Sequence, residues 1–169
     1  EPQYLVVYIN GVKRYRCKNT QKEPYDLEVP DPDERNTVRA SGVQPEFLHN
    51  MVKQMSFYEF LQIRRNATFE FDPKIQVTAN KTDMTFSMTC PDTKDSITFR
   101  HKFDRPKTSL TDTFKGFYMV KEIAKVIRFC TLNEKKVIIE CINIEGKPQP
   151  LRISFFNDHY VCHTLIAPL

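Results

Sequence analysis

The most informative part of the sequence is its ending, Pro150-Leu-Arg-Ile-Ser-Phe-Phe-Asn-Asp-His-Tyr-Val-Cys-His-Thr-Leu-Ile-Ala-Pro-Leu169. Residues with high strand propensity fill Leu151 to Phe156 and Tyr160 to Leu165, and the turn formers Asn157-Asp158 separate them. The pattern predicts a β-hairpin. Apolar residues follow it directly, although chain ends are usually polar. We expect such an ending either to pack into the domain or to form a docking surface.

The composition is that of a chain able to build a packed core. The 169 residues suit one or two domains, with 40% apolar and 27% charged residues. No apolar run approaches the roughly 20 residues that cross a membrane, and no signal-peptide pattern is present. The sequence begins with Glu1 rather than Met, which leaves a preceding segment open. The net charge of +4 permits contact with nucleic acid without requiring it.

The cysteines point to free thiols in a reducing compartment. Their number is odd, and no pair has Cys-x-x-Cys spacing. Two sequons, at Asn66 and Asn80, would argue for secretion, but such triplets occur by chance in many intracellular chains. The five positions are Cys17, Cys90, Cys130, Cys141 and Cys162.

The first part of the chain combines a hairpin with a linker. Tyr4 to Ile9 and Val12 to Cys17 are predicted strands around Asn10-Gly11, a strong hairpin signal. Residues 19–36 carry three prolines and six acidic residues, so we expect an extended connection.

The remaining residues show the order strand, helix, strands twice, which predicts an α+β fold with helices on one face of antiparallel sheets. Identity between the two copies is slight, and any α+β domain can show such an order. The first copy is expected to contain strand Thr37–Ala40, helix Gln44–Met55 and strands Phe57–Ile63, Phe69–Phe71, Ile75–Ala79, Met84–Thr89 and Ser96–Lys102. The second is expected to contain strand Thr111–Tyr118, helix Met119–Cys130 and strands Lys136–Asn143, Leu151–Phe156 and Tyr160–Leu165.

Basic residues follow the apolar stripe of both predicted helices. Lys121, Lys125 and Arg128 have i, i+4, i+7 spacing and share one face, with Glu122 expected to point elsewhere. His49 and Lys53 occupy the corresponding flank of the first helix. This spacing suits the phosphate backbone of double-stranded DNA, although an ordinary solvated helix face is the alternative. No aromatic platform for single strands is evident, so the expected contact is non-specific, duplex-tolerant and salt-dependent.

The sequence contains no convincing catalytic or metal site. His159 and His163 should lie on one face of the last hairpin and Cys162 on the other, so fewer than three ligands converge. A Gly-rich phosphate loop and a triad-like motif are also lacking. We therefore expect a protein that is not an enzyme and uses no cofactor or metal.

The repeated order, the basic helices and the apolar ending resemble the sliding clamp family, in particular proliferating cell nuclear antigen. Members have two domains, each with two strand–helix–strands units, with helices lining a central hole and sheets outside. The resemblance implies the DNA-clamp fold, with most of the N-terminal domain missing. Residues 1–18 would end that domain, 19–36 would form the interdomain connector, and 37–169 would form the C-terminal domain, with units at about 37–103 and 110–169.

The resemblance also implies a pocket for partner peptides. Tyr25-Asp26-Leu27-Glu28-Val29-Pro30 matches the connector's apolar–x–apolar–Pro element, and Pro150-Leu151 matches a Pro-Leu pair at the start of a strand. The terminal segment matches as well, except that Leu165 stands where the family usually has an aromatic residue. The expected peptide-binding residues are Leu27, Val29, Pro30, Pro150, Leu165, Ile166, Ala167 and Pro168.

By this resemblance the protein is expected to hold DNA polymerase and other replication or repair proteins on duplex DNA. It would act in the nucleus or a viral replication compartment, as a homotrimer or in a clamp heterotrimer. A checkpoint-type clamp subunit, a monomeric or dimeric viral processivity factor, and a protein-interaction domain without DNA binding are the alternatives. Two further departures from the family are the long segment Phe57–Lys74 and His49, a weaker cation than arginine.

Overall fold

The computed structural model divides the chain into two compact units, Glu1–Asp31 and Pro32–Leu169. In the first unit, β1 (Tyr4–Ile9) and β2 (Val12–Lys18) pair antiparallel, which confirms the predicted hairpin. The residues that the structure describes are 4–9, 12–18, 36–65, 74–90, 93–107, 113–144 and 146–169.

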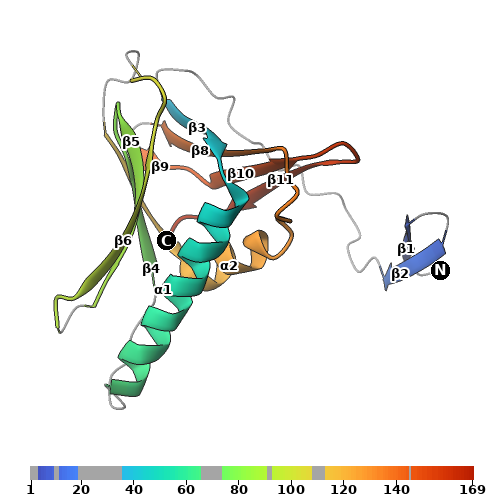
Figure 1. Cartoon of the computed structure of the whole chain (residues 1–169), viewed down its shortest axis with the longest axis horizontal. Helices are drawn as coiled ribbons and strands as arrows, with labels where there is room; N and C mark the ends of the chain where they lie inside the picture. The colour runs from blue at the N-terminus through green and yellow to red at the C-terminus, as the bar shows by residue number, and fades with distance from the viewer. Residues whose placement is uncertain are drawn as a thin grey trace. The chain divides into compact units, whose positions relative to one another are not determined.

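The described residues of the second unit form two antiparallel sheets and two helices, α1 (Pro45–Arg65) and α2 (Val120–Ile127), which confirms the α+β prediction (Figure 1). One sheet has the order β11–β10–β8–β3, and β9 also pairs with β8; the other has the order β6–β5–β4–β7. The strands are β3 (Thr37–Val43), β4 (Lys74–Ala79), β5 (Asp83–Thr89), β6 (Ser96–Lys102), β7 (Phe114–Met119), β8 (Lys136–Ile144), β9 (Lys147–Pro148), β10 (Leu151–Phe156) and β11 (Val161–Ile166).

The first strand of each repeat pairs with the sheet of the other repeat. β3 precedes α1 but lies beside β8, where Ala40 is the partner of Ile139. β7 precedes α2 but lies beside β4, where Gly116 is the partner of Val77. The order strand–helix–strands therefore occurs twice, as predicted, and the exchange joins both copies into one folded body.

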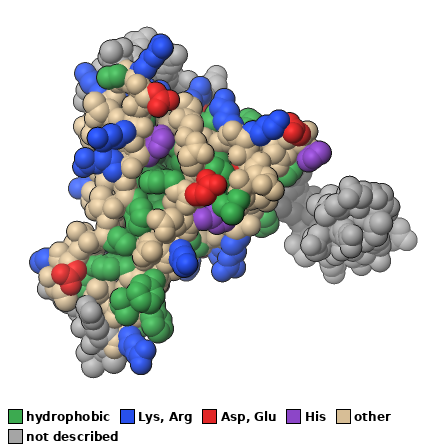
Figure 2. All heavy atoms as spheres, in the orientation of Figure 1, with side chains coloured by type: hydrophobic (Ala, Val, Ile, Leu, Met, Phe, Trp, Pro, Cys, Tyr) green, Lys and Arg blue, Asp and Glu red, His purple; other side chains and the backbone are tan. Residues whose placement is uncertain are grey.

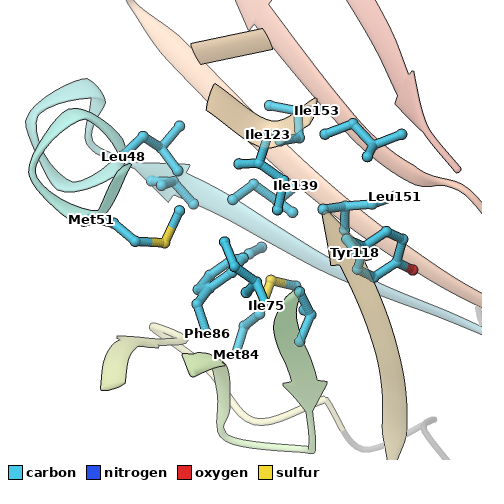
Figure 3. Close-up of a cluster of buried hydrophobic side chains, with 14 of the residues drawn as sticks. Leu48, Met51, Ile75, Met84, Phe86, Tyr118, Ile123, Ile139, Leu151 and Ile153 are labelled. Atoms are coloured by element: carbon cyan, nitrogen blue, oxygen red, sulfur yellow. The ribbon is translucent and has the colours of Figure 1, made fainter. Parts of the chain in front are cut away.

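Alternating strand residues and the apolar stripes of the helices form one core. In Figure 3, Leu48 and Met51 of α1 approach Ile75 of β4 and Phe86 of β5, and all four are almost completely buried. Ile139 of β8 belongs to the same cluster. Burial of each such side chain contributes about 1.5–3 kcal/mol, so this shared core is the main stabilising feature.

Helix α1 is much longer than predicted, and the strand predicted at Phe57–Ile63 is wrong. The structure continues the helix to Arg65 because Met55 and Gln62 keep the helical spacing of the buried side, with 0% and 2% exposed. The Tyr58 hydroxyl donates to the Asp95 carbonyl at 2.6 Å and fastens this extension to the β5–β6 turn. Strand propensity was overridden by tertiary packing.

The other boundaries agree more closely with the prediction. β6 and β10 have the predicted bounds, and the second helix ends at Ile127 rather than Cys130. The strand predicted at Phe69–Phe71 lies outside the described residues.

A buried carboxylate joins three strands on the first sheet. Glu140 of β8 is 4% exposed and lies between Arg39 of β3 and Arg152 of β10, its direct cross-strand partners. One oxygen accepts from Arg39 Nε and Nη2, both at 2.8 Å, and the other lies 3.4 Å from Arg152 Nη1. Two cations thus compensate the desolvation of one acid.

We predict that Glu140→Gln lowers the free energy of unfolding by about 1–3 kcal/mol, because two charge-assisted contacts weaken at a buried site. The matched control is Glu122→Gln, which removes an exposed ion pair with Lys125 and should cost less than about 0.5 kcal/mol. Urea unfolding of both variants measures the difference. Equal losses would contradict a structural role for the buried carboxylate.

Candidate nucleic-acid and partner-peptide interfaces

Helix α2 presents its basic residues away from the core. Val120, Ile123 and Ile127 are buried, whereas Lys121 and Lys125 are exposed. Arg128 is one residue beyond the helix, but its φ of −61° and ψ of −25° continue the helical path. The structure therefore brings Lys121, Lys125 and Arg128 to one solvent-facing strip, as their spacing indicates.

Glu122 does not point away from this strip, so that expectation is wrong. Its two carboxylate oxygens lie 2.9 and 3.1 Å from Lys125 Nζ, in an i, i+3 pair. Both side chains are largely exposed, so the pair is weak. Among the described residues, no ion pair involves Lys121 or Arg128, which leaves these two as the more available cations.

On α1, His49 and Lys53 have different surroundings. His49 is half-buried, and its Nε2 donates to the Cys130 carbonyl at 2.7 Å, which holds α1 against the end of α2. Lys53 is exposed one turn further along. Because α1 and α2 contact one another, the two predicted basic strips lie on neighbouring helices (Figure 1).

The segment after α2 is fixed by Glu134, which is 6% exposed. This carboxylate accepts from the Thr131 N–H and hydroxyl and from the Tyr160 hydroxyl. The hydrogen bond from Tyr160 raises the pKa of that phenol. Burial, with Glu134 adding to it, raises the pKa of Cys130 to about 11. The thiol therefore stays neutral at physiological pH.

The C-terminal segment lies against the domain and contributes to its core. Ile166 of β11 pairs with Leu151 of β10 and is 3% exposed. It therefore packs beneath the residues of the C-terminal segment that reach the surface. Ala167 is exposed, whereas Pro150, Leu165 and Pro168 are half-buried. Two of the three predicted peptide-binding patches are therefore adjacent. The third, at Leu27, Val29 and Pro30, lies outside the described residues.

Phe117 of β7 belongs beside this surface, and sequence reasoning missed it. The N–H of Leu169 donates to the Phe117 carbonyl at 2.9 Å, so the chain end runs along β7. Phe117 is 36% exposed, and Lys74 and Lys115 lie 5.9 and 5.5 Å from its ring centre. Strand residues alternate between the two faces of a sheet, so the sequence could have indicated that Phe117 faces away from its buried neighbour Tyr118. The position of the chain end beside Phe117 depends on the fold.

The residues considered for metal binding have other roles. His163 Nδ1 and Ser154 Oγ are joined by a hydrogen bond of 2.8 Å, and His159 lies in the turn before β11 rather than on a strand face. Within the described ranges, no three His, Cys, Asp or Glu residues gather as a metal site. Cys130, Cys141 and Cys162 are free thiols, in agreement with the prediction for these three. No described helix has the length and apolar character of a membrane span.

Neither a protein-family model nor a curated protein matches this sequence. Three solved structures with a similar fold are sliding clamps. The β subunit of DNA polymerase III from Borrelia burgdorferi is 16% identical, with a TM-score of 0.53 over 98% of this chain and 38% of that one. The Helicobacter pylori β clamp is 12% identical, with a TM-score of 0.56 over 90% of this chain and 37% of that one.

The Entamoeba histolytica proliferating cell nuclear antigen is 12% identical, with a TM-score of 0.52 over all of this chain and 60% of that one. The chain thus has the sliding-clamp fold, which confirms the predicted fold and the resemblance to this family. It spans between 37% and 60% of the length of these three proteins.

We predict that Ile166→Ala lowers the free energy of unfolding by about 2–5 kcal/mol, because a buried side chain is replaced by a cavity. Leu165→Ala, at the neighbouring half-buried position, is the control and should cost clearly less. Urea unfolding measures both. Similar small losses would contradict the placement of Ile166 in the core.

Proposed function

We propose that the chain is part of a DNA sliding clamp or polymerase processivity factor, which holds DNA polymerase and other replication or repair proteins on duplex DNA. The observation that carries this proposal is the exposed basic strip of α2, next to Lys53 of α1, on a chain with the clamp fold. The role is binding rather than catalysis.

The proposed contact with DNA is electrostatic and non-specific. Lys121, Lys125 and Arg128 are spaced by about one helical turn, roughly 5–6 Å, and offer positive charge without a fixed pattern of donors for base edges. Such contacts release counterions and weaken steeply as salt rises, which suits a protein that slides. A polymerase tethered to the clamp would gain effective concentration at its substrate.

The proposed partner site is the C-terminal surface. Pro150, Leu165, Ala167 and Pro168 present apolar surface there, with Phe117 beside them. We propose that they accept a short polymerase peptide with apolar or aromatic anchors, together with Leu27, Val29 and Pro30 of the connector. Ile166 supports this surface without reaching it.

We further propose that the protein works as a homo-oligomer, a trimer, or within a clamp heterotrimer, in the nucleus or a viral replication compartment. Strand β6 supports this proposal, because it is an edge of its sheet and pairs only with β5 among the described strands. Exposed edges of this kind can pair with another chain. The solution mass of the protein, with and without duplex DNA, tests the assembly state.

We predict that the combined variant Lys121→Ala, Lys125→Ala, Arg128→Ala binds duplex DNA about tenfold or more weakly at low salt. The slope of log affinity against log salt should fall by about 2, because Lys125 is already paired with Glu122. Fluorescence anisotropy with a labelled blunt duplex measures both quantities.

The matched control removes three exposed lysines from the β6–β5–β4–β7 sheet. Its substitutions are Lys74→Ala, Lys102→Ala and Lys115→Ala. This control should change the slope of log affinity against log salt by much less than the α2 variant does. Unchanged binding by the α2 variant, or an equal loss in the control, would overturn the assignment of the helices to DNA.

We predict that Ala167→Glu weakens binding of a polymerase clamp-binding peptide about tenfold, because a charge replaces a small apolar side chain at the centre of the proposed surface. Leu27→Ala should also weaken it. Leu132→Ala is the control, since Leu132 is 60% exposed in the segment after α2. Isothermal titration measures the affinities, and equal values for all three variants and the parent would rule out this surface.

A further inference from the structure

The extension of α1 exposes two aromatic rings. Phe57 is 56% exposed and Phe60 is 54% exposed, although both would normally be buried. Figure 2 shows hydrophobic side chains gathered over the lower half of α1, which projects past α2 in Figure 1. Exposed apolar side chains that gather in one place often mark a binding surface.

Two cations share the helix face with these rings. Lys53, Phe57, Phe60 and Arg64 have i, i+4, i+7, i+11 spacing, which keeps them on one face of a helix. All four are exposed, whereas Met55 is buried on the other side. We refer to Lys53, Phe57, Phe60 and Arg64 as the aromatic strip. It runs over about 16 Å, from one cation through two rings to another cation.

The charges beside the strip are compatible with an anionic partner. The exposed residues next to it on α1 include Asn50 and Gln54, which are neutral. The one acid between Lys53 and Arg64 is Glu59, which is half-buried, and burial raises its pKa. The strip therefore combines positive charge at both ends with two ring faces between them.

We propose that the aromatic strip binds single-stranded DNA, with unpaired bases stacking on Phe57 and Phe60 and phosphates meeting Lys53 and Arg64. Base stacking on aromatic side chains combined with basic residues is the usual chemistry of single-strand binding. The inference rests on the proposed function: the strip continues the face of α1 that carries Lys53, and it would hold a single-stranded segment that follows the duplex. Phenylalanine rings can stack little on paired bases, because the faces of those bases are already covered by their neighbours in the duplex.

A second copy of this chain is a less suitable occupant. Two such strips packed together would bring Lys53 and Arg64 near the same cations of the other copy. No exposed acidic residue lies between these two positions on α1 to neutralise them. Apolar contact areas between proteins are depleted in charge at their centre. The charge pattern therefore favours a nucleic acid.

The test compares the parent with the double variant Phe57→Ala, Phe60→Ala, using a labelled oligothymidine, a blunt duplex and a duplex with a single-stranded overhang. Alanine is a good helix former and both positions are exposed, so the fold should be retained. We expect about tenfold weaker binding of the oligothymidine and the overhang, and less than twofold change for the blunt duplex. Val161→Ala, at a position that is 55% exposed on β11, is the control and should change none of the three.

The pair Phe57→Trp, Phe60→Trp should retain single-strand affinity, and Phe57→Leu, Phe60→Leu should lose it, because stacking needs a flat ring. Equal affinity of the alanine variant and the parent for oligothymidine would overturn the proposal. So would a fall in solution mass of the alanine variant with unchanged DNA binding, which would identify a second copy as the occupant.

The test separates this inference from the proposed function. If Phe57→Ala, Phe60→Ala has no effect while the α2 charge variant weakens blunt-duplex binding, the strip is not a single-strand site and the clamp proposal stands. If the alanine variant loses only single-strand binding while the α2 charge variant binds duplex normally, the strip is supported and the duplex assignment fails.

Discussion

The two repeats are held together because each contributes its first strand to the sheet of the other. β3 closes the sheet of β8, β10 and β11, and β7 closes the sheet of β4, β5 and β6. Neither repeat can bury its apolar face alone, because part of each sheet comes from the other repeat. The exchange also sets α1 and α2 beside one another. The proposed DNA face is therefore a product of strand pairing far from it.

Two surfaces with different chemistry follow from this arrangement. The helices carry exposed cations and, on α1, two exposed rings. The C-terminal segment instead forms an apolar surface on Ile166 and along β7, where the Leu169 N–H binds the Phe117 carbonyl. Charge suits a contact that slides and apolar anchors suit a contact that persists. The fold keeps the two proposed functions on different elements.

Sequence reasoning predicted most elements but misjudged two features, each for a physical reason. Phe57 to Ile63 has the composition of a strand, yet Met55 and Gln62 are buried on one helix face, so packing decided the outcome. Glu122 was expected to point away from the basic strip, but it pairs with Lys125 three residues later. Sequence spacing alone does not show whether such a pair forms. The chain end was expected either to pack into the domain or to form a docking surface, and Ile166 packs into the domain.

The sequence by itself determined the class of the fold, the two amphipathic helices and the final hairpin, since these follow from local periodicity and turn residues. Only the tertiary structure decided that β3 and β7 exchange sheets, that Glu140 lies between Arg39 and Arg152, and that Phe57 and Phe60 face solvent beside Lys53. These features depend on contacts between residues far apart in the chain. Local periodicity cannot specify them, because the same pattern is compatible with several pairings of the strands.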